Sequence, residues 1–281
     1  MNPVLILARL AIKEAVRRKI AVASVILGVA FLLVFNIGFH FLVSDIGTSR
    51  LSQERQAVIL KQAYNFLHLA AMYATNFMTI VFATLITSDT LSGEIATGTI
   101  QVTVAKPIRR WQVVLGKWLG NAVLLALYFL LLAGGSVLGI WAQTGYTAPG
   151  LAPGMALVFL NGLLVMTVAL AFSASMSTLA TGGAVFGLFG VAFIGGWVER
   201  IGNFLNNQTA VNVGIVSSLL MPSEAVWNLA SKLMTDTLAS AIGATPFSYG
   251  VSPSPLMIDF TFLYLAGFLA YAFYKFNRRD L

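Results

Sequence analysis

The sequence has no cysteine and only two histidines among its 281 residues. Without cysteine the chain can form no disulfide, no thiolate metal site and no cysteine nucleophile. His40 and His68 each stand alone in an apolar run, where a histidine more often packs and hydrogen-bonds than binds a metal. The HExxH metal motif and the Gly-x-Ser-x-Gly hydrolase motif are missing as well. We therefore expect no catalytic residue and no metal site in this chain.

Charge is scarce and apolar residues are abundant. Only 10% of the residues are charged, while 58% are hydrophobic, a composition typical of membrane proteins. The net charge of +7 comes from basic residues at the ends of apolar runs, not from a basic stripe of the kind that binds nucleic acid. We attribute this charge to membrane topology and to contact with anionic lipid.

Six apolar segments are long enough to cross a bilayer as helices. A hydrocarbon core of about 30 Å requires roughly 20 helical residues. The predicted fold is an all-α polytopic membrane protein, with residues 1–281 forming a single transmembrane domain. Only the region of Thr181 and Gly182 separates the fourth span from the fifth, which predicts a tight helical hairpin. The predicted spans are residues 20–43, 66–87, 113–140, 154–180, 183–201 and 256–275.

The distribution of basic residues predicts the orientation. Of the 17 Lys and Arg residues, twelve fall on the side that carries both termini and residues 88–112, and five fall on the other side. Because Lys and Arg are enriched in cytoplasmic loops, we predict that both termini and this loop are cytoplasmic. The expected location is the inner (cytoplasmic) membrane, which the chain crosses six times.

Residues 1–19 have the pattern of a basic amphipathic helix. Apolar residues recur at helical spacing, basic residues from Arg9 to Arg17 lie four apart on another face, and Glu14 is placed to pair with Arg18. Such a helix is suited to the inner headgroup layer of the membrane. The same charges would also orient the first span, and the two interpretations are compatible.

The region 200–255, on the outer side, is too apolar for a solvated connection. One predicted helix face carries Trp227 and Met234 among other apolar residues, and the opposite face carries Glu224 and Asn228 among polar ones. We predict a helical or re-entrant segment between the fifth and sixth spans that lies on or dips into the outer leaflet. It would form part of an exit gate or shield the helix bundle as a lid.

The fifth span is rich in glycine. Gly183, Gly187, Gly190, Gly195 and Gly196 would allow another helix to approach closely. The partner would be the fourth span or a second copy of the chain. We expect tight helix packing, rather than the lining of a substrate path, to be the main role of these glycines.

The middles of the six predicted spans contain no Asp, Glu, Lys or Arg. Intramembrane ionisable residues are the usual sign of proton or ion coupling, so the sequence argues against a proton-driven carrier. The chain also lacks a Walker A phosphate loop. We therefore predict that it is not itself an ATPase and that the energy for transport comes from another protein.

The loop 88–112 is the most densely functionalised segment. It is longer and more highly charged than a simple connection between two spans requires. Two acids, Asp89 and Glu94, alternate with two glycines, Gly93 and Gly98, and basic residues follow around Pro107, a favourable first residue for a helix. This pattern indicates recognition by a second macromolecule. The motifs are Ser92-Gly93-Glu94, Gly98-Thr99, Lys106-Pro107-Ile108-Arg109-Arg110 and Gly116-Lys117.

These motifs, between the second and third of six spans, resemble the type-2 ABC export permeases. The resemblance implies a transmembrane permease subunit that dimerises, with an identical or a related chain, and docks two cytoplasmic ABC ATPase subunits. ATP and Mg²⁺ would bind to those ATPases, so no cofactor is expected in this chain. Residues 1–19 would be the connecting helix, and residues 88–112 the coupling loop that seats in the ATPase.

The resemblance also assigns site residues. Glu94, Gly98 and Thr99 would belong to the ATPase-facing coupling element. An acid contributes little to topology, so Glu94 is our first candidate for a coupling residue. The arginines of the elbow would bond carboxylates on the partner or lipid phosphates, or serve only as positive-inside anchors. The residues of the elbow that begins the third span are Pro107, Arg109, Arg110 and Lys117.

The sequence leaves the cargo undefined and identifies no substrate-binding residue. The uncharged spans favour an amphipathic, lipid-like or drug-like cargo, moved by export. Within the same class, the ATPase cycle would instead do mechanical work on a partner at the outer face. The alternative from another class is a membrane channel, scaffold or membrane-embedded enzyme that works without an ATPase.

Overall fold

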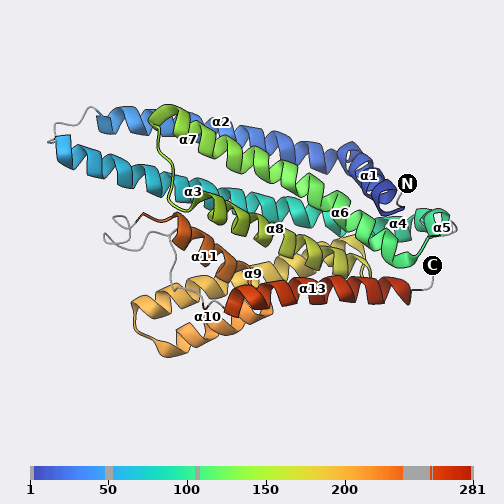
Figure 1. Ribbon diagram of the computed structural model, residues 1–281. Helices are drawn as coiled ribbons and strands as arrows, with labels where there is room; N and C mark the ends of the chain where they lie inside the picture. Colours follow the sequence, from blue (N-terminus) through green and yellow to red (C-terminus); the bar gives the residue numbers. More distant parts are fainter. Residues whose placement is uncertain (1–2, 48–52, 105–107, 237–253, 255, 280–281) are drawn as a thin grey trace.

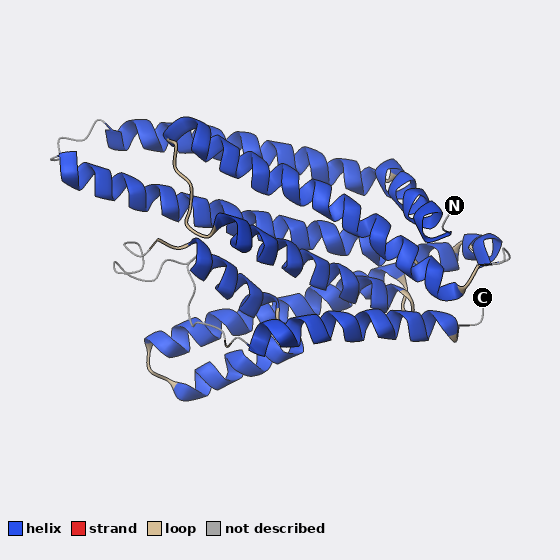
Figure 2. Cartoon of the chain, in the orientation of Figure 1, coloured by secondary structure: helices blue, strands red, loops and turns tan. Residues whose placement is uncertain are grey.

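The computed structural model describes residues 3–47, 53–104, 108–236, 254 and 256–279 (Figure 1). Helices make up 88% of the structure, and the residues it describes form no strand (Figure 2). The predicted all-α fold is confirmed.

The long helices are joined by shorter ones at both ends of the bundle. The long helices are α2 (Lys19–Gly47), α3 (Gln53–Ser88), α6 (Arg110–Phe129) with the π-helical turn η1 (Leu130–Gly134) and α7 (Gly135–Thr144), α8 (Leu151–Ser173), α9 (Thr178–Phe204) and α13 (Leu256–Asn277). The shorter ones are α1 (Pro3–Arg17), α4 (Ser92–Ala96), α5 (Thr99–Val104), α10 (Gln208–Leu220) and α11 (Ser223–Met234).

Six segments of the described chain are long and apolar enough to cross a membrane, as the sequence predicts. Most of them extend beyond the predicted limits because helix continues past the apolar residues; α3, for example, begins at Gln53. The segments are Lys19–Asp45, Ala57–Ala96, Arg110–Thr144, Leu151–Ser173, Thr178–Phe204 and Leu256–Asn277.

The predicted boundary between the fourth and fifth spans is wrong. α8 ends at Ser173, and residues 174–177 form the turn, which therefore precedes the Thr181-Gly182 region. Serine hydroxyls before and within the turn donate to backbone carbonyls of α8, and the Ser177 hydroxyl accepts from the backbone as the N-cap of α9. Serine competes with helical hydrogen bonding in this way, and the hydropathy of the surrounding run hides the effect.

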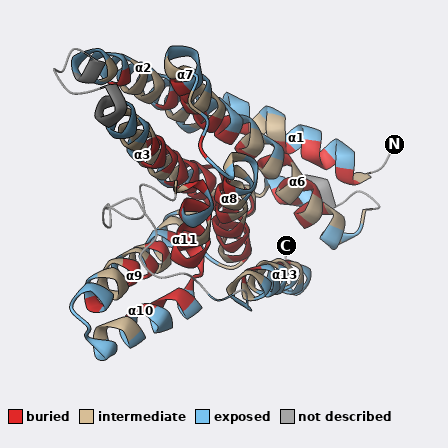
Figure 3. Cartoon of the chain, turned by 60° about the vertical axis from the view of Figure 1, so that its left-hand side comes forward, coloured by how far each residue is buried: buried red, intermediate tan, exposed pale blue. Residues whose placement is uncertain are grey.

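The core of the protein is organised around α8. This helix packs against α3, α6, α9, α11 and α13. In its most apolar stretch 61% of the residues are buried, compared with 11% in α2 and in α13, and the same contrast is visible in Figure 3. The apolar surfaces of α2 and α13 are therefore left to lipid or to other protein chains.

The N-terminal helix α1 is fixed to the bundle through α6. An apolar stripe from Val4 to Ala15 is buried against it. Gly116 and Gly120 face this stripe, and a Cβ atom at Gly120 would come within 2.7 Å of the carbonyl oxygen of Ala8. The two glycines therefore permit the close approach of α1, while Arg9 remains exposed on the opposite face.

Amide side chains join the spans inside the bundle. The Asn161 amide of α8 donates to the Asn76 side-chain oxygen of α3 at 2.9 Å, and the Asn121 amide of α6 donates to the Thr90 hydroxyl at 3.0 Å. All four residues are buried. Hydrogen bonds of this kind between helices stabilise membrane proteins by roughly 0.6 kcal/mol each on average.

The segment between the fifth and sixth spans contains two helices with a sharp bend between them, an arrangement that fits either a re-entrant loop or a broken span. α10 packs against α9, and α11 follows at an angle of 105° to α10 (Figure 1). Gly195 and Gly196 of α9 allow this packing, because a Cβ atom at either would overlap Ser217 or Glu224. Gly183, Gly187 and Gly190 have no such neighbours, and their predicted packing against the fourth span does not occur.

The expected polar outer face of α11 is corrected by the structure. Glu224 and Asn228 are buried, as are Trp227 and Met234 on the apolar face. The guanidinium of Arg200 in α9 donates to the Glu224 carboxylate at 3.1 Å and to the Asn228 side-chain oxygen at 3.0 Å. Glu224 and Asn228 thus pair with the largely buried Arg200 guanidinium instead of facing water, whereas Lys232 on the same helix is exposed.

We predict that Arg200→Met destabilises the protein by about 3–5 kcal/mol, because it leaves the buried Glu224 carboxylate without its counter-ion. The double variant Arg200→Met/Glu224→Met should recover most of this loss, since both charges are removed together. Unfolding by denaturant in detergent micelles measures both. Lys232→Met is the control, since Lys232 is exposed on the same helix. If the double variant loses as much stability as Arg200→Met and Glu224→Met lose together, the result would contradict the pairing.

Candidate functional site at the loop between α3 and α6

The loop between α3 and α6 lies at the end of the bundle that carries α1, α4, α5 and the last turn of α13 (Figure 1). We call this the basic end. Two of the predicted residues form the turn between α4 and α5. Gly98 has a φ of +72°, which glycine adopts at little cost, and the Thr99 hydroxyl bonds that of Thr97 at 3.0 Å. Thr97, Thr99 and Gln101 are exposed, and they give the loop a polar outer surface.

Glu94 and Lys117 are brought together in an ion pair. The Lys117 side chain is only 4% exposed and donates a hydrogen bond to the Glu94 carboxylate, whose side chain is 14% exposed. A second carboxylate, that of Glu14 in α1, lies 3.7 Å from the Lys117 ammonium. Three elements, α4, α6 and α1, therefore meet at one buried cation.

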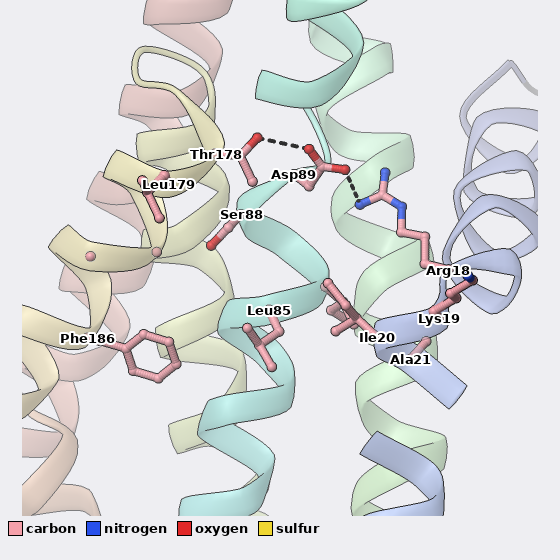
Figure 4. A pocket seen from close by; sticks show the side chains of 13 residues that line it. Arg18, Lys19, Ile20, Ala21, Leu85, Ser88, Asp89, Thr178, Leu179 and Phe186 are labelled. Carbon is pink, nitrogen blue, oxygen red and sulfur yellow. Dashed lines mark hydrogen bonds and ion pairs between the residues drawn. The ribbon is translucent and has the colours of Figure 1, made fainter. Parts of the chain in front are cut away.

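Asp89 makes a second polar junction. Its carboxylate pairs with the Arg18 guanidinium at 2.9 Å and accepts from the Thr178 hydroxyl at 2.8 Å (Figure 4). The Ser92 hydroxyl also bonds that of Thr178, at 2.8 Å. Gly93 is required beside this cluster, because a Cβ atom there would overlap the Asp89 carboxylate. The junction links the start of α2, the end of α3, α4 and the start of α9.

A cavity of about 580 Å³ lies next to this junction, between α2, α3 and α9. Figure 4 shows Arg18, Asp89 and Thr178 at one end of it, with Leu85 and Phe186 farther away. Most of its wall is apolar, and Gly182 and Gly183 of α9 contribute to it without side chains. The combination of a charged end and an apolar body matches an amphipathic molecule.

The arginines of the elbow have different positions. Arg109 is exposed, and its backbone N–H donates to the Gln112 side chain at 2.9 Å in the first turn of α6. The Arg110 guanidinium donates to the carbonyl oxygens of Asn277 and Arg279, at 3.1 and 2.7 Å, at the end of α13. A cation at a helix C-terminus satisfies free carbonyls and complements the helix dipole.

The comparison with protein families is decisive for the class of this protein. The family model described as "ABC-2 family transporter protein" matches residues 5–281. The chain belongs to the ABC-2 transporter family. The resemblance drawn from the loop motifs is confirmed, and membership implies a permease subunit of an ABC transporter that works with an ATPase partner. A search of curated proteins found no match.

In this ABC-2 protein the predicted site residues separate into groups. Glu94 pairs with Lys117, Gly98 and Thr99 lie where α4 turns into α5, and Arg110 binds the end of α13. Pro107 lies outside the described residues. The Glu94 side chain points toward α6 and is only 14% exposed. It is therefore less available for direct contact with an ATPase than the sequence-based prediction implies.

Sequence reasoning missed part of the network. The predicted pair of Glu14 and Arg18 does not form, because α1 ends at Arg17 and Arg18 lies in the break before α2. Asp89 was noted only as an acid of the loop, and its partner Thr178 is 89 residues away in sequence. The one feature of the sequence that points to a role for Asp89 is its position at the end of an apolar run.

We predict that Glu94→Ala lowers the free energy of unfolding by about 3 kcal/mol, because the buried Lys117 ammonium loses its nearest anion. Glu94→Gln should cost less, since its amide oxygen still accepts the hydrogen bond. In the double variant Glu94→Ala/Lys117→Met the loss should be smaller than the sum of the single losses by about 1–3 kcal/mol.

Denaturant unfolding of the four proteins in one detergent gives the complete double-mutant cycle. Glu14→Gln is the control, since Glu14 is 38% exposed and farther from the ammonium, and a small effect is expected. Additive losses would show that Glu94 and Lys117 are not coupled.

Proposed function

We propose that this chain is the transmembrane subunit that docks a separate ATPase on its α4–α5 loop and converts the ATPase cycle into movement of the spans. The observation that carries the proposal is the set of ion pairs and hydrogen bonds that attach this loop to α1, α2, α6 and α9. ATP and Mg²⁺ would be bound by two partner ATPases, one for each permease of a dimer.

The loop has separate surfaces for contact and for transmission. Thr97, Thr99 and Gln101 are exposed and would contact the partner. Glu94 points inward and Asp89 is partly exposed, and their bonds to Lys117 and Thr178 would pass a displacement of the loop to α6 and α9. Such coupling requires contiguous contacts with two discrete arrangements, and the two polar junctions supply the contacts.

The cavity beside Asp89 supports an amphipathic cargo. Its apolar wall would accept a hydrocarbon or aromatic portion, and the Arg18–Asp89 pair would face a polar portion. Both α9 and α2, which move with the junction in this proposal, form part of the wall. Closing the cavity on one side and opening the bundle on the other would expel the cargo toward the outer face.

A second permease copy, identical or related, would cover part of the exposed apolar surface. On α9, Gly187 and Gly190 lie three residues apart with open space in front of them. Small residues on one helix face allow two spans to pack closely. In the proposed orientation, the basic end faces the cytoplasm and the chain lies in the inner membrane, with both termini cytoplasmic.

We predict that the protein, purified in mild detergent from its native cells, retains an ATPase in near-stoichiometric amount. Thr97→Arg should weaken this association by about tenfold or more, because it introduces a bulky cation at the proposed contact surface, and scrambling residues 91–110 should abolish it. Subunit stoichiometry and ATP hydrolysis of the purified complex measure the effect.

Two variants serve as controls for this experiment. Thr147→Arg makes the same change at an exposed site between α7 and α8, and Glu94→Ala alters the inward side of the loop; both should retain the ATPase. A stable, inserted chain that carries no ATPase at any salt concentration would support the alternative of an ATPase-independent channel, scaffold or enzyme.

We predict that the basic end is cytoplasmic. The chain has no cysteine, so Thr97→Cys and Asn203→Cys each introduce the only thiol, at exposed positions of opposite ends. A membrane-impermeant maleimide should label Thr97→Cys only in inside-out vesicles and Asn203→Cys only in intact cells or spheroplasts. The reverse pattern would invert the proposed orientation, and labelling of both from one side would refute the six-span topology.

A further inference from the structure

A groove at the basic end lies between the start of α6 and the end of α13. Its volume is about 600 Å³. Arg109, Arg110 and Trp111 line it from α6, and Phe273, Tyr274 and Asn277 line it from α13. None of the residues that line it is acidic. The groove lies at the first turn of α6, whereas Lys117, which pairs with Glu94, lies seven residues beyond Arg110 along the helix.

The charge around the groove is entirely positive among the described residues that form it. Arg109 is exposed at the first turn of α6. The Arg278 guanidinium lies 4.6 Å from the centre of the Tyr274 ring, a cation–π contact that places a third arginine beside a residue of the groove wall. Guanidinium groups are suited to phosphate, which they can bind through two parallel hydrogen bonds.

The groove is formed before any ligand arrives. The bonds from Arg110 to the Asn277 and Arg279 carbonyls join its two walls. Arg279 in turn donates to the carbonyl oxygen of Ala174, just after the end of α8, at 2.6 Å. A site that is rigid without ligand loses little conformational freedom on binding.

The position of the groove favours a lipid over a soluble anion or a protein. It lies where two membrane spans end, and Trp111 and Tyr274 are 43% and 51% exposed, as expected of aromatic side chains at the membrane–water boundary. Below it, the apolar surface of α13 is largely uncovered, and Leu263 and Phe262 are 71% and 55% exposed. Acyl chains can therefore lie along α13 while the headgroup enters the groove.

We propose that this groove binds the headgroup of one anionic phospholipid, with Arg109 and Arg278 contacting its phosphate and Arg110 contributing positive charge from the wall. The acyl chains lie against α13. The bound lipid joins the start of α6 to the end of α13, and this role does not depend on whether the α4–α5 loop docks an ATPase.

Titration of the delipidated full-length chain with phosphatidylglycerol tests the proposal. Native mass spectrometry should find one tightly retained phosphatidylglycerol per chain and much weaker retention of phosphatidylcholine with the same acyl chains. Arg109→Gln and Arg278→Gln should each weaken the apparent affinity about fivefold, as expected for one basic residue near an anionic lipid. Lys13→Gln removes the same charge from exposed α1 and should leave this affinity unchanged.

A second measurement locates the lipid and does not depend on retention in the gas phase. Phosphatidylglycerol with brominated acyl chains should quench the fluorescence of Trp111, seen as the difference between the wild-type chain and Trp111→Phe. Arg109→Gln should reduce that quenching at equal lipid concentration. Arg109 is exposed, so this variant should fold normally.

Four results would overturn the proposal. They are equal retention of the two lipids, an effect of Lys13→Gln as large as that of Arg109→Gln, displacement of the lipid by an equal concentration of inorganic phosphate, and lipid retention that appears only after residues 280–281 are deleted. Loss of a bound ATPase in Arg109→Gln, with lipid affinity unchanged, would assign the groove to the protein partner instead.

Discussion

The buried ammonium of Lys117 is the constraint on which the basic end of this ABC-2 permease depends. An ammonium with 4% exposure is unfavourable without a counter-ion. α6 itself supplies no acid at this position, and the two carboxylates that meet the ammonium come from α4 and α1. α4 therefore supplies the nearest counter-ion, and α1 adds a second carboxylate farther from the ammonium. Gly116 and Gly120 make this possible, because only a helix face without side chains allows α1 to come so close.

At the other end of the bundle, too, a cation removed from water requires acceptors, but there they come from a single helix. There the cation is Arg200 of α9, whose side chain is 11% exposed, and its acceptors come from α11. Glu224 and Asn228 hold the first turns of α11 inside the bundle, against the tendency of their polar side chains to face water. At both ends of the bundle a cation with little exposure is therefore paired with acceptors on neighbouring elements.

The sequence predicts the spans well because hydropathy and length are local properties. The amino acids that form the polar junctions are recognised only in part. Glu94 could be selected because an acid has little role in topology, whereas Lys117 could be read equally well as a topological charge, and their pairing follows only from the fold. Asp89 and Thr178 are separated by 89 residues, and no local pattern joins them.

The errors share a physical cause. The prediction for α11 assumes that its polar face contacts water. In the structure Arg200 contacts Glu224 and Asn228 on that face and supplies their hydrogen bonds. Similarly, the sequence predicts the turn after α8 at the Thr181-Gly182 region. The serine hydroxyls that bond the last carbonyls of the helix lie a few residues earlier. In both cases hydropathy averages over side chains whose specific hydrogen bonds determine the structure.

The two ends differ in how they can transmit movement. At the basic end, the acids lie on the short α4–α5 loop and its flanks, and their partners lie on long helices; a force on the loop therefore acts on α6 and α9 near their ends. At the opposite end, Arg200 lies on α9 itself, 22 residues beyond Thr178 along the same helix. α9 thus contacts both polar junctions, while α8 is buried between its neighbours. A tilt of α9 against α8 would change the cavity at Asp89 and the position of α11 together, which makes α9 the element that can link the two faces of the membrane.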